Sequence, residues 1–171
     1  LDLDHHAVAA ERPGRMVEVY RSLAALEDAV RDGNLRHVEF FFNPDYFYPN
    51  GIDYPSMVAG MAEGVEQARK SFGVSCLLIC CIDRSINNGA QAVAIVETAL
   101  AHRHELVVGI GLDGNESVGP PALYAEAYAL ARKAGLKCTA HCCEDYLTPL
   151  EAPPTNYLIC RDVLRCDRID H

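Results

Sequence analysis

The stretch Leu136–Glu144 reads Leu-Lys-Cys-Thr-Ala-His-Cys-Cys-Glu, an apolar run that ends in a histidine and a glutamate three residues apart. Gly135 precedes the run and is a typical helix terminator. The pattern predicts a buried strand that ends at His141, with Glu144 in the loop that follows. In a parallel barrel, strand ends of this kind lie on the C-terminal face, where active sites sit. His141 could then bind a metal ion, and Glu144 could transfer protons.

The rest of the chain alternates between apolar, strand-like runs and helical patterns. Strands are expected at residues 37–42, 72–82, 106–112, 138–141 and 167–171, and helices at residues 16–35, 55–70, 89–103, 120–133 and 157–164. This alternation is typical of parallel βαβ units. Right-handed crossovers then build either a barrel or an open doubly wound sheet. The hydrophobic periodicity alone leaves both architectures open.

Three segments resemble successive motifs of the adenosine/adenine deaminase family: Val108–Glu116, Thr139–Glu144 and Arg168–His171. Their order and spacing are similar to the family pattern, and weaker similarity extends back to His37–Pro44. The resemblance implies a TIM (β/α)8 barrel of the metal-dependent amidohydrolases, of which this chain covers about five βα units. The Gly-Leu-Asp-Gly run at 111–114 and the Arg-Ile-Asp-His run look closer to the adenine deaminase branch.

The resemblance also implies a role for individual residues. His141 would be a metal ligand, and Glu144 would be the acid that protonates a ring nitrogen of the substrate. His171 would orient and deprotonate the attacking water, while Asp113 and the backbone around Gly114 would line the slot for the base. The implied reaction is zinc-dependent hydrolytic deamination of an aminated purine or a related heterocycle, with release of ammonia. The resemblance also implies that each chain binds one divalent ion.

Simpler interpretations of the same residues stay open. A strand-end histidine is often only hydrogen-bonded, a loop glutamate is often only solvated, and a strand-end aspartate often caps the next helix.

The chain also departs from the family pattern, because Cys142-Cys143 replace the usual Ala-Gly between the histidine and the glutamate. The first-strand His-x-His motif and the later Ser-Asn and Asp-Asp motifs are missing. The adjacent pair His5-His6 has the wrong spacing and is expected to be solvated. The alternative function is a catalytically inactive, deaminase-like module for binding or assembly.

The length suggests part of a larger barrel. With 171 residues and no initial methionine, the chain falls short of the roughly 200 residues or more of a (β/α)8 barrel. Residues 1–171 are therefore expected to form a single domain that is an interior portion of the barrel. Such a piece leaves sheet edges unpaired and lacks most of the metal ligands, so this segment alone is expected to be inactive.

The formal net charge of −9 disfavours nucleic acid and anionic membranes as partners. The chain has no apolar run of 18 residues and hence no expected membrane span. A small-molecule partner is expected, and the oligomeric state is left open. The eight cysteines fall mostly in or beside apolar runs without Cys-x-x-Cys spacing, which favours buried, reduced thiols in a cytoplasmic protein. A secreted, disulfide-bridged protein is the alternative.

Two further features lie in or after the strand predicted at residues 37–42. Glu39 lies inside this strand, where a structural salt bridge is expected rather than catalysis. Tyr46, Phe47 and Tyr48 follow in a loop that would lie on the active-site side of a barrel. These three aromatic side chains either line a pocket for a flat ring or anchor the loop by packing.

Overall fold

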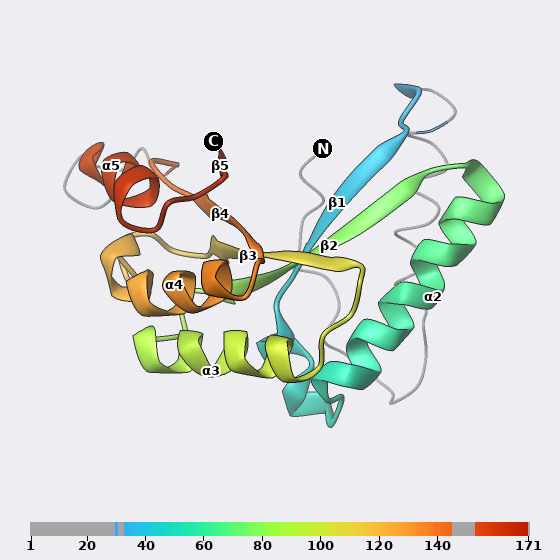
Figure 1. Cartoon of the computed structure of the whole chain (residues 1–171), viewed down its shortest axis with the longest axis horizontal. Helices are drawn as coiled ribbons and strands as arrows, with labels where there is room; N and C mark the ends of the chain where they lie inside the picture. Colours follow the sequence, from blue (N-terminus) through green and yellow to red (C-terminus); the bar gives the residue numbers. More distant parts are fainter. Residues whose placement is uncertain (1–29, 31–32, 145–152, 171) are drawn as a thin grey trace. The chain divides into compact units, whose positions relative to one another are not determined.

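The computed structural model describes residues 30, 33–144 and 153–170 (Figure 1). Five strands form one sheet in the order β1-β2-β3-β4-β5: β1 (His37–Phe42), β2 (Ser75–Asp83), β3 (Val107–Asp113), β4 (Lys137–His141) and β5 (Arg168–Asp170). The pairs β2–β3, β3–β4 and β4–β5 are parallel. A doubly wound sheet reverses its strand order at a switch point. The described part of this sheet has no reversal, which favours a barrel.

Helices fill the connections between the strands. They are α2 (Tyr54–Phe72), α3 (Gly89–Ala101), α4 (Ala125–Lys133) and α5 (Thr155–Asp162), with short 3-10 helices η1 (Pro44–Tyr46), η2 (Tyr48–Asn50) and η3 (Pro121–Tyr124). The helix expected at residues 120–133 is divided into η3 and α4. Of the helix expected at residues 16–35, only residues 30 and 33–35 lie within the described part. No helix in the described ranges is both long and apolar enough to cross a membrane.

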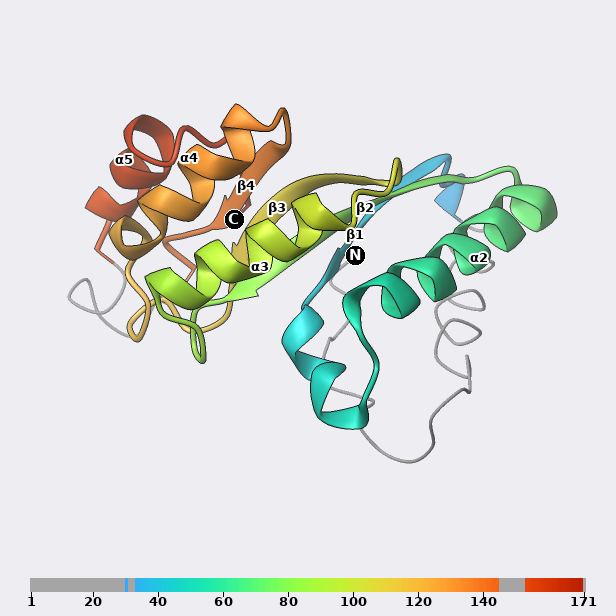
Figure 2. The same ribbon diagram turned by 60° about the horizontal axis from the view of Figure 1, so that its bottom comes forward.

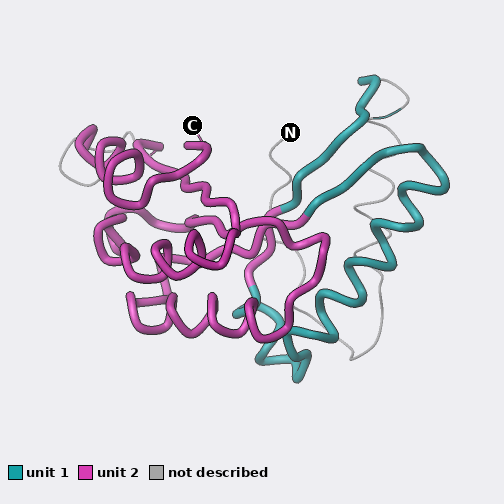
Figure 3. The backbone as a smooth tube through the Cα atoms, in the orientation of Figure 1, with its two compact units in different colours: residues 1–40, 44–77 teal, residues 41–43, 78–171 magenta. Residues whose placement is uncertain are grey.

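The chain divides into two compact units, coloured separately in Figure 3. The first comprises the described parts of residues 1–40 and 44–77. Its core gathers apolar side chains of β1, α2 and β2 around three buried residues, Ala68, Val74 and Cys76. Helix α2 begins where the Asp53 carboxylate accepts a hydrogen bond from the Ser56 amide at 2.9 Å. It ends at Gly73, whose φ of 69° suits a glycine.

The second unit comprises residues 41–43 and the described part of residues 78–171. Helices α3 and α4 lie side by side in Figures 1 and 2 and pack against each other. Strand β2 is buried along nearly its whole length, as expected for a parallel strand with both faces covered. The Tyr128 hydroxyl of α4 is buried and donates a hydrogen bond to the Thr139 carbonyl of β4 at 2.6 Å. This contact joins α4 to the strand that carries His141.

The close approach of β3 and β4 depends on glycine at position 109. Gly109 lies opposite Lys137 in the strand register, and a Cβ at Gly109 would lie 2.8 Å from the Lys137 carbonyl oxygen. We expect Gly109→Ala to destabilise the folded protein by about 1–3 kcal/mol, because a strand carbonyl cannot move aside. The matched control is Gly60→Ala in α2, where an added Cβ would meet no atom within 4 Å beyond the neighbouring backbone of its own helix. That control should stabilise the protein by about 0.5–1 kcal/mol. Urea unfolding of both variants measures the difference, and equal effects would contradict the proposed packing.

Candidate active site

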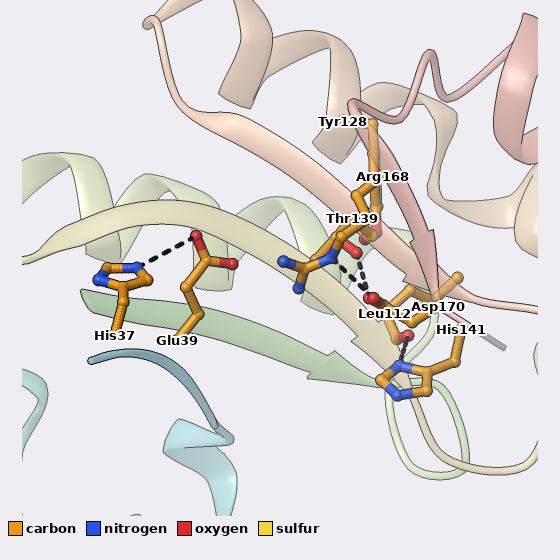
Figure 4. A network of polar contacts seen from close by, with 8 residues as sticks. All are labelled: His37, Glu39, Leu112, Tyr128, Thr139, His141, Arg168 and Asp170. Carbon is orange, nitrogen blue, oxygen red and sulfur yellow. Dashed lines mark hydrogen bonds and ion pairs between the residues drawn. The ribbon is translucent and has the colours of Figure 1, made fainter. Parts of the chain in front are cut away.

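His141 ends β4 with its imidazole held in a defined direction (Figure 4). Its Nδ1 lies 3.2 Å from the Leu112 carbonyl oxygen. Since a carbonyl only accepts hydrogen bonds, Nδ1 carries the proton and Nε2 is the nitrogen with a lone pair to offer. The Phe41 ring packs against the imidazole edge-on, with 5.3 Å between ring centroids. Metal-binding histidines commonly donate their second ring N–H to a backbone carbonyl in this way, so the geometry of His141 suits a metal ligand.

Asp113 ends β3 beside Asp83, its register partner at the end of β2. The Asn43 side-chain amide donates to the Asp113 carboxylate at 2.8 Å. Burial raises the pKa of Asp113 above its usual value, and the negative charge of Asp83 raises it further, while the hydrogen bond from Asn43 opposes both effects. The nearby His141 also influences this carboxyl group electrostatically. The structure therefore brings two of the predicted site residues, Asp113 and His141, into one electrostatic environment.

Gly114 follows β3 in a left-handed turn with φ of 78°. The buried Arg84 donates from Nε to the Gly114 carbonyl at 2.8 Å, and the Asn115 amide donates to the Ser85 hydroxyl at 2.7 Å. A Cβ at position 114 would collide with the side chains of Asp83 and Ser85. The backbone expected to line the base slot thus needs glycine and is fixed by the loop that follows β2.

Glu144 lies three residues after His141 and is exposed. Between them, Cys142 is buried, whereas Cys143 is exposed and has a φ of 60°, which is unusual for a residue other than glycine. The Cys143 amide donates to the buried Glu116 carboxylate at 2.8 Å. The glutamate predicted to be catalytic is therefore attached to a backbone segment held by the loop that follows β3.

Four residues that organise this site were not predicted from the sequence: Asn43, Arg84, Glu116 and Asn156. Each is buried or nearly so, and each directs a polar group at another loop or strand end. Asn43 and Arg84 directly follow strands β1 and β2, so their positions gave a usable signal. Asn156 lies in the first turn of α5 and gave none.

Strand β5 pairs with β4 so that His141 lies opposite Asp170. The Asp170 carboxylate accepts hydrogen bonds from the Thr139 hydroxyl and from Arg168 Nε, the latter at 2.7 Å (Figure 4). This pairing fixes the end of β5, to which the next residue, His171, is attached. His171 itself lies outside the described residues, as do His5 and His6, so the roles predicted for them stay predictions.

The two features predicted around β1 belong to the first unit. The Glu39 carboxylate oxygen lies 3.9 Å from His37 Nε2, and the two side chains form an ion pair when His37 is protonated (Figure 4). This contact agrees with a structural role for Glu39. Tyr46 and Tyr48 are exposed and Phe47 is half-buried. A contribution of these rings to a pocket stays a prediction.

The described residues contribute only part of a metal centre. Among them, no group of three or more histidine, cysteine, aspartate or glutamate side chains is arranged to hold a metal ion. His141 can contribute Nε2 as one ligand, because its Nδ1 is hydrogen-bonded to the Leu112 carbonyl. All eight cysteines are free thiols, and six of them are buried.

Comparison with known proteins identifies the family. The family model for adenosine deaminase matches residues 12–171. The chain belongs to the adenosine deaminase family. An adenine deaminase from Cupriavidus metallidurans is 35% identical over 138 residues, which cover 81% of this chain and 37% of the relative. The chain thus spans well under half the length of this relative, and the similarity to the adenine deaminase branch is confirmed.

Two solved structures share the fold of this chain. An amidohydrolase from Burkholderia ambifaria with bound Zn is 38% identical, with a TM-score of 0.80 and coverage of 90% of this chain and 40% of that one. An adenine deaminase from Arthrobacter aurescens is 31% identical, with a TM-score of 0.77 and coverage of 90% and 44%. Together with the unreversed strand order, they confirm the TIM (β/α)8 fold, of which the described residues supply five strands.

Thiol labelling tests the backbone geometry between His141 and Glu144. We expect iodoacetamide to modify Cys143 in the folded protein, because its side chain is exposed, and to modify Cys80 and Cys81 only after unfolding, because both are fully buried. Partial desolvation and the neighbouring Cys142 raise the pKa of the exposed Cys143 thiol, so its labelling rate should still increase above pH 9. Mass spectrometry of tryptic peptides measures both effects. Native labelling of Cys80 or Cys81 before Cys143 would contradict this structure.

Proposed function

We propose that the full-length protein catalyses zinc-dependent hydrolytic deamination of an aminated purine or a related amino-heterocycle, with release of ammonia. The observation that carries the proposal is the direction of the His141 imidazole, whose Nδ1 contacts the Leu112 carbonyl at 3.2 Å. This contact makes Nε2 the nitrogen that can bind a metal, at the strand end next to Asp113. Relatives named adenine deaminase, and a similar amidohydrolase with bound Zn, support the same reaction.

The metal would be held in part by His141. Its neutral imidazole, with the second ring nitrogen hydrogen-bonded to a carbonyl, fits a zinc ligand. The family pattern places further ligands in the first-strand His-x-His motif and a late aspartate, neither of which this chain contains. When bound, a divalent ion of this kind supplies a water activated for attack at neutral pH.

The remaining site residues would act on the substrate and its protons. We assign Glu144 to protonation of a ring nitrogen, because attack on an aromatic ring places charge there that a nearby acid can neutralise. His171 would take the proton of the attacking water. Asp113 and the fixed backbone at Gly114 would line the slot for the base, where a buried carboxyl group and peptide groups can pair with ring nitrogens.

The setting of this activity is also proposed. Residues 1–171 would form part of a single barrel domain in the full-length protein. The free and mostly buried thiols favour a reducing compartment, which supports a cytoplasmic location. The net charge of −9 supports a small-molecule substrate over nucleic acid.

A substrate screen tests the proposed reaction directly. The full-length protein is incubated with aminated purines, their nucleosides and aminated pterins, and loss of ultraviolet absorbance is recorded together with release of ammonia. Deamination of at least one of these compounds supports the proposal. Absence of turnover with all of them, in protein that contains its metal, would favour an inactive binding or assembly module.

We predict that the full-length protein carries about one divalent ion per chain, with zinc the expected metal because histidine ligands suit it. Residues 1–171 alone should retain no stoichiometric metal and no activity, since His141 by itself cannot hold the ion. Elemental analysis after gel filtration measures metal content in both proteins. Full activity in metal-free protein, or deamination by residues 1–171 alone, would contradict the assignment.

Replacement of Glu144 separates catalysis from metal binding. Glu144→Gln preserves size and hydrogen bonding but removes the transferable proton. We expect the turnover rate to fall by at least about 10²-fold, as is usual for loss of a general acid. Metal content should stay unchanged, and KM should change far less than kcat, because the lost interaction belongs to the transition state. His141→Ala should instead lose metal and activity together.

Glu97→Gln provides the matched control, since Glu97 is an exposed glutamate of α3. This control should leave turnover and metal content at wild-type values. Near-normal turnover in Glu144→Gln would rule out its role as the acid. Loss of metal in that variant would place Glu144 among the ligands instead.

A further inference from the structure

Glu116 lies in the loop between β3 and η3 and is almost completely buried, with 1% of its surface exposed. Its Oε2 accepts a hydrogen bond from the Cys143 backbone amide at 2.8 Å. Its Oε1 accepts one from the side-chain amide of Asn156 at 2.7 Å. One carboxylate therefore joins three segments: the loop after β3, the loop after β4 and the first turn of α5.

The backbone that Glu116 holds is conformationally unusual. Cys143 has a φ of 60°, in the left-handed region that residues with a Cβ seldom occupy. Such a conformation persists only where the surroundings fix it. The surroundings here are the Glu116 carboxylate at the Cys143 amide and the Pro153 carbonyl oxygen, which lies 4.0 Å from the Cys143 sulfur. The next residue in the chain is Glu144.

Glu116 is itself firmly placed. The two preceding residues, Gly114 and Asn115, are fixed by Arg84 and Ser85 through hydrogen bonds of 2.8 and 2.7 Å. On its other side, the buried Asn156 is carried by α5. Because the Glu116 carboxylate is held in place in this way, its hydrogen bond fixes the backbone next to Glu144 relative to the loop that follows β3.

We propose that Glu116 is a positioning residue, which sets the direction of Glu144 relative to the base slot at Gly114. The proposal rests on the function proposed above, in which Glu144 is the acid. Both Glu116 oxygens accept hydrogen bonds from protein groups, so the residue acts through the Cys143 backbone and not on the substrate. Displacement of a catalytic group by about 1 Å can lower turnover about 10²-fold, which makes this contact matter to rate.

An exchange of donor and acceptor between positions 116 and 156 tests the role. Asn156→Asp places two carboxylates 2.7 Å apart in a buried site, and should lower kcat about 10²-fold with KM within about threefold of wild type. The double variant Glu116→Gln/Asn156→Asp restores complementarity, because the glutamine oxygen accepts from Cys143 and its amide donates to the aspartate. It should recover kcat to within about fivefold of wild type. Glu116→Gln alone should also stay active, since the Asn156 amide can turn to present its oxygen.

The same variants distinguish the other roles that Glu116 could have. If Glu116 were an acid or base in the reaction, both variants with glutamine at position 116 would lose activity, and the positioning role would be overturned. If Glu116 only stabilised the fold, Asn156→Asp would lose folded protein and metal in proportion to activity, with kcat per folded, metal-containing molecule unchanged. That result would also overturn the proposal.

Amide hydrogen exchange gives a readout that needs no activity. We expect exchange at the Cys143 amide to increase at least about 10-fold in Glu116→Ala and Asn156→Asp, and to return toward the wild-type rate in the double variant. Unchanged exchange in Glu116→Ala would overturn the positioning role. If the wild-type protein deaminates no compound in the screen, the proposed function fails, while exchange at Cys143 still decides whether Glu116 holds this backbone.

Discussion

The hydrogen bond from Arg84 to the Gly114 carbonyl, at 2.8 Å, is the contact around which the strand ends are arranged. Arg84 is 2% exposed, and a buried guanidinium needs acceptors close by. The Gly114 carbonyl provides one only because Gly114 adopts a left-handed turn, which turns this peptide group toward the loop after β2. On either side of that turn, the Leu112 carbonyl accepts a hydrogen bond from the His141 imidazole, and the Glu116 carboxylate accepts one from the Cys143 amide. Support for the site thus passes from β2 to β3 and from β3 to β4.

Hydrophobic patterning predicted the strands well, because β2, β3 and β4 are short apolar runs that are mostly buried. Strand β1 was predicted at residues 37–42, where the structure has it. The segment at residues 120–133 was predicted less well. The chain there first forms the 3-10 helix η3, as is frequent at the N-terminus of an α-helix, and α4 begins only at Ala125.

Some residues of the candidate site can be predicted from the sequence, and others cannot. His141 and Glu144 follow an apolar run at fixed spacing, so their chemistry and position are visible along the chain. Pairings such as Glu116 with Asn156 join residues 40 positions apart, and nothing local indicates that one will meet the other. Buried polar groups find partners only once the loops are placed. The residues that support a site are therefore harder to predict than those that perform its chemistry.

The residues around Asp113 also change the pKa of its carboxyl group. Its carboxyl group is partly buried beside Asp83, so desolvation and the neighbouring charge raise its pKa, while the Asn43 amide limits the rise. Because the pKa is raised in the folded state, the stability contributed by Asp113 is fully present below its unfolded value of about 3.8 and is lost as the pH rises through the folded pKa. Ionisation of Asp113 therefore lowers the stability of the folded protein.

Such an arrangement is expected where a carboxyl group serves a site rather than the fold. A leucine at this position would be compatible with a buried strand end, but it could neither pair with the ring nitrogens of a base nor interact electrostatically with His141. The Asn43 amide stabilises the ionised carboxylate and points it along one direction. Position 43 therefore belongs to the candidate site as much as position 113 does, although it lies only in the weaker similarity at His37–Pro44.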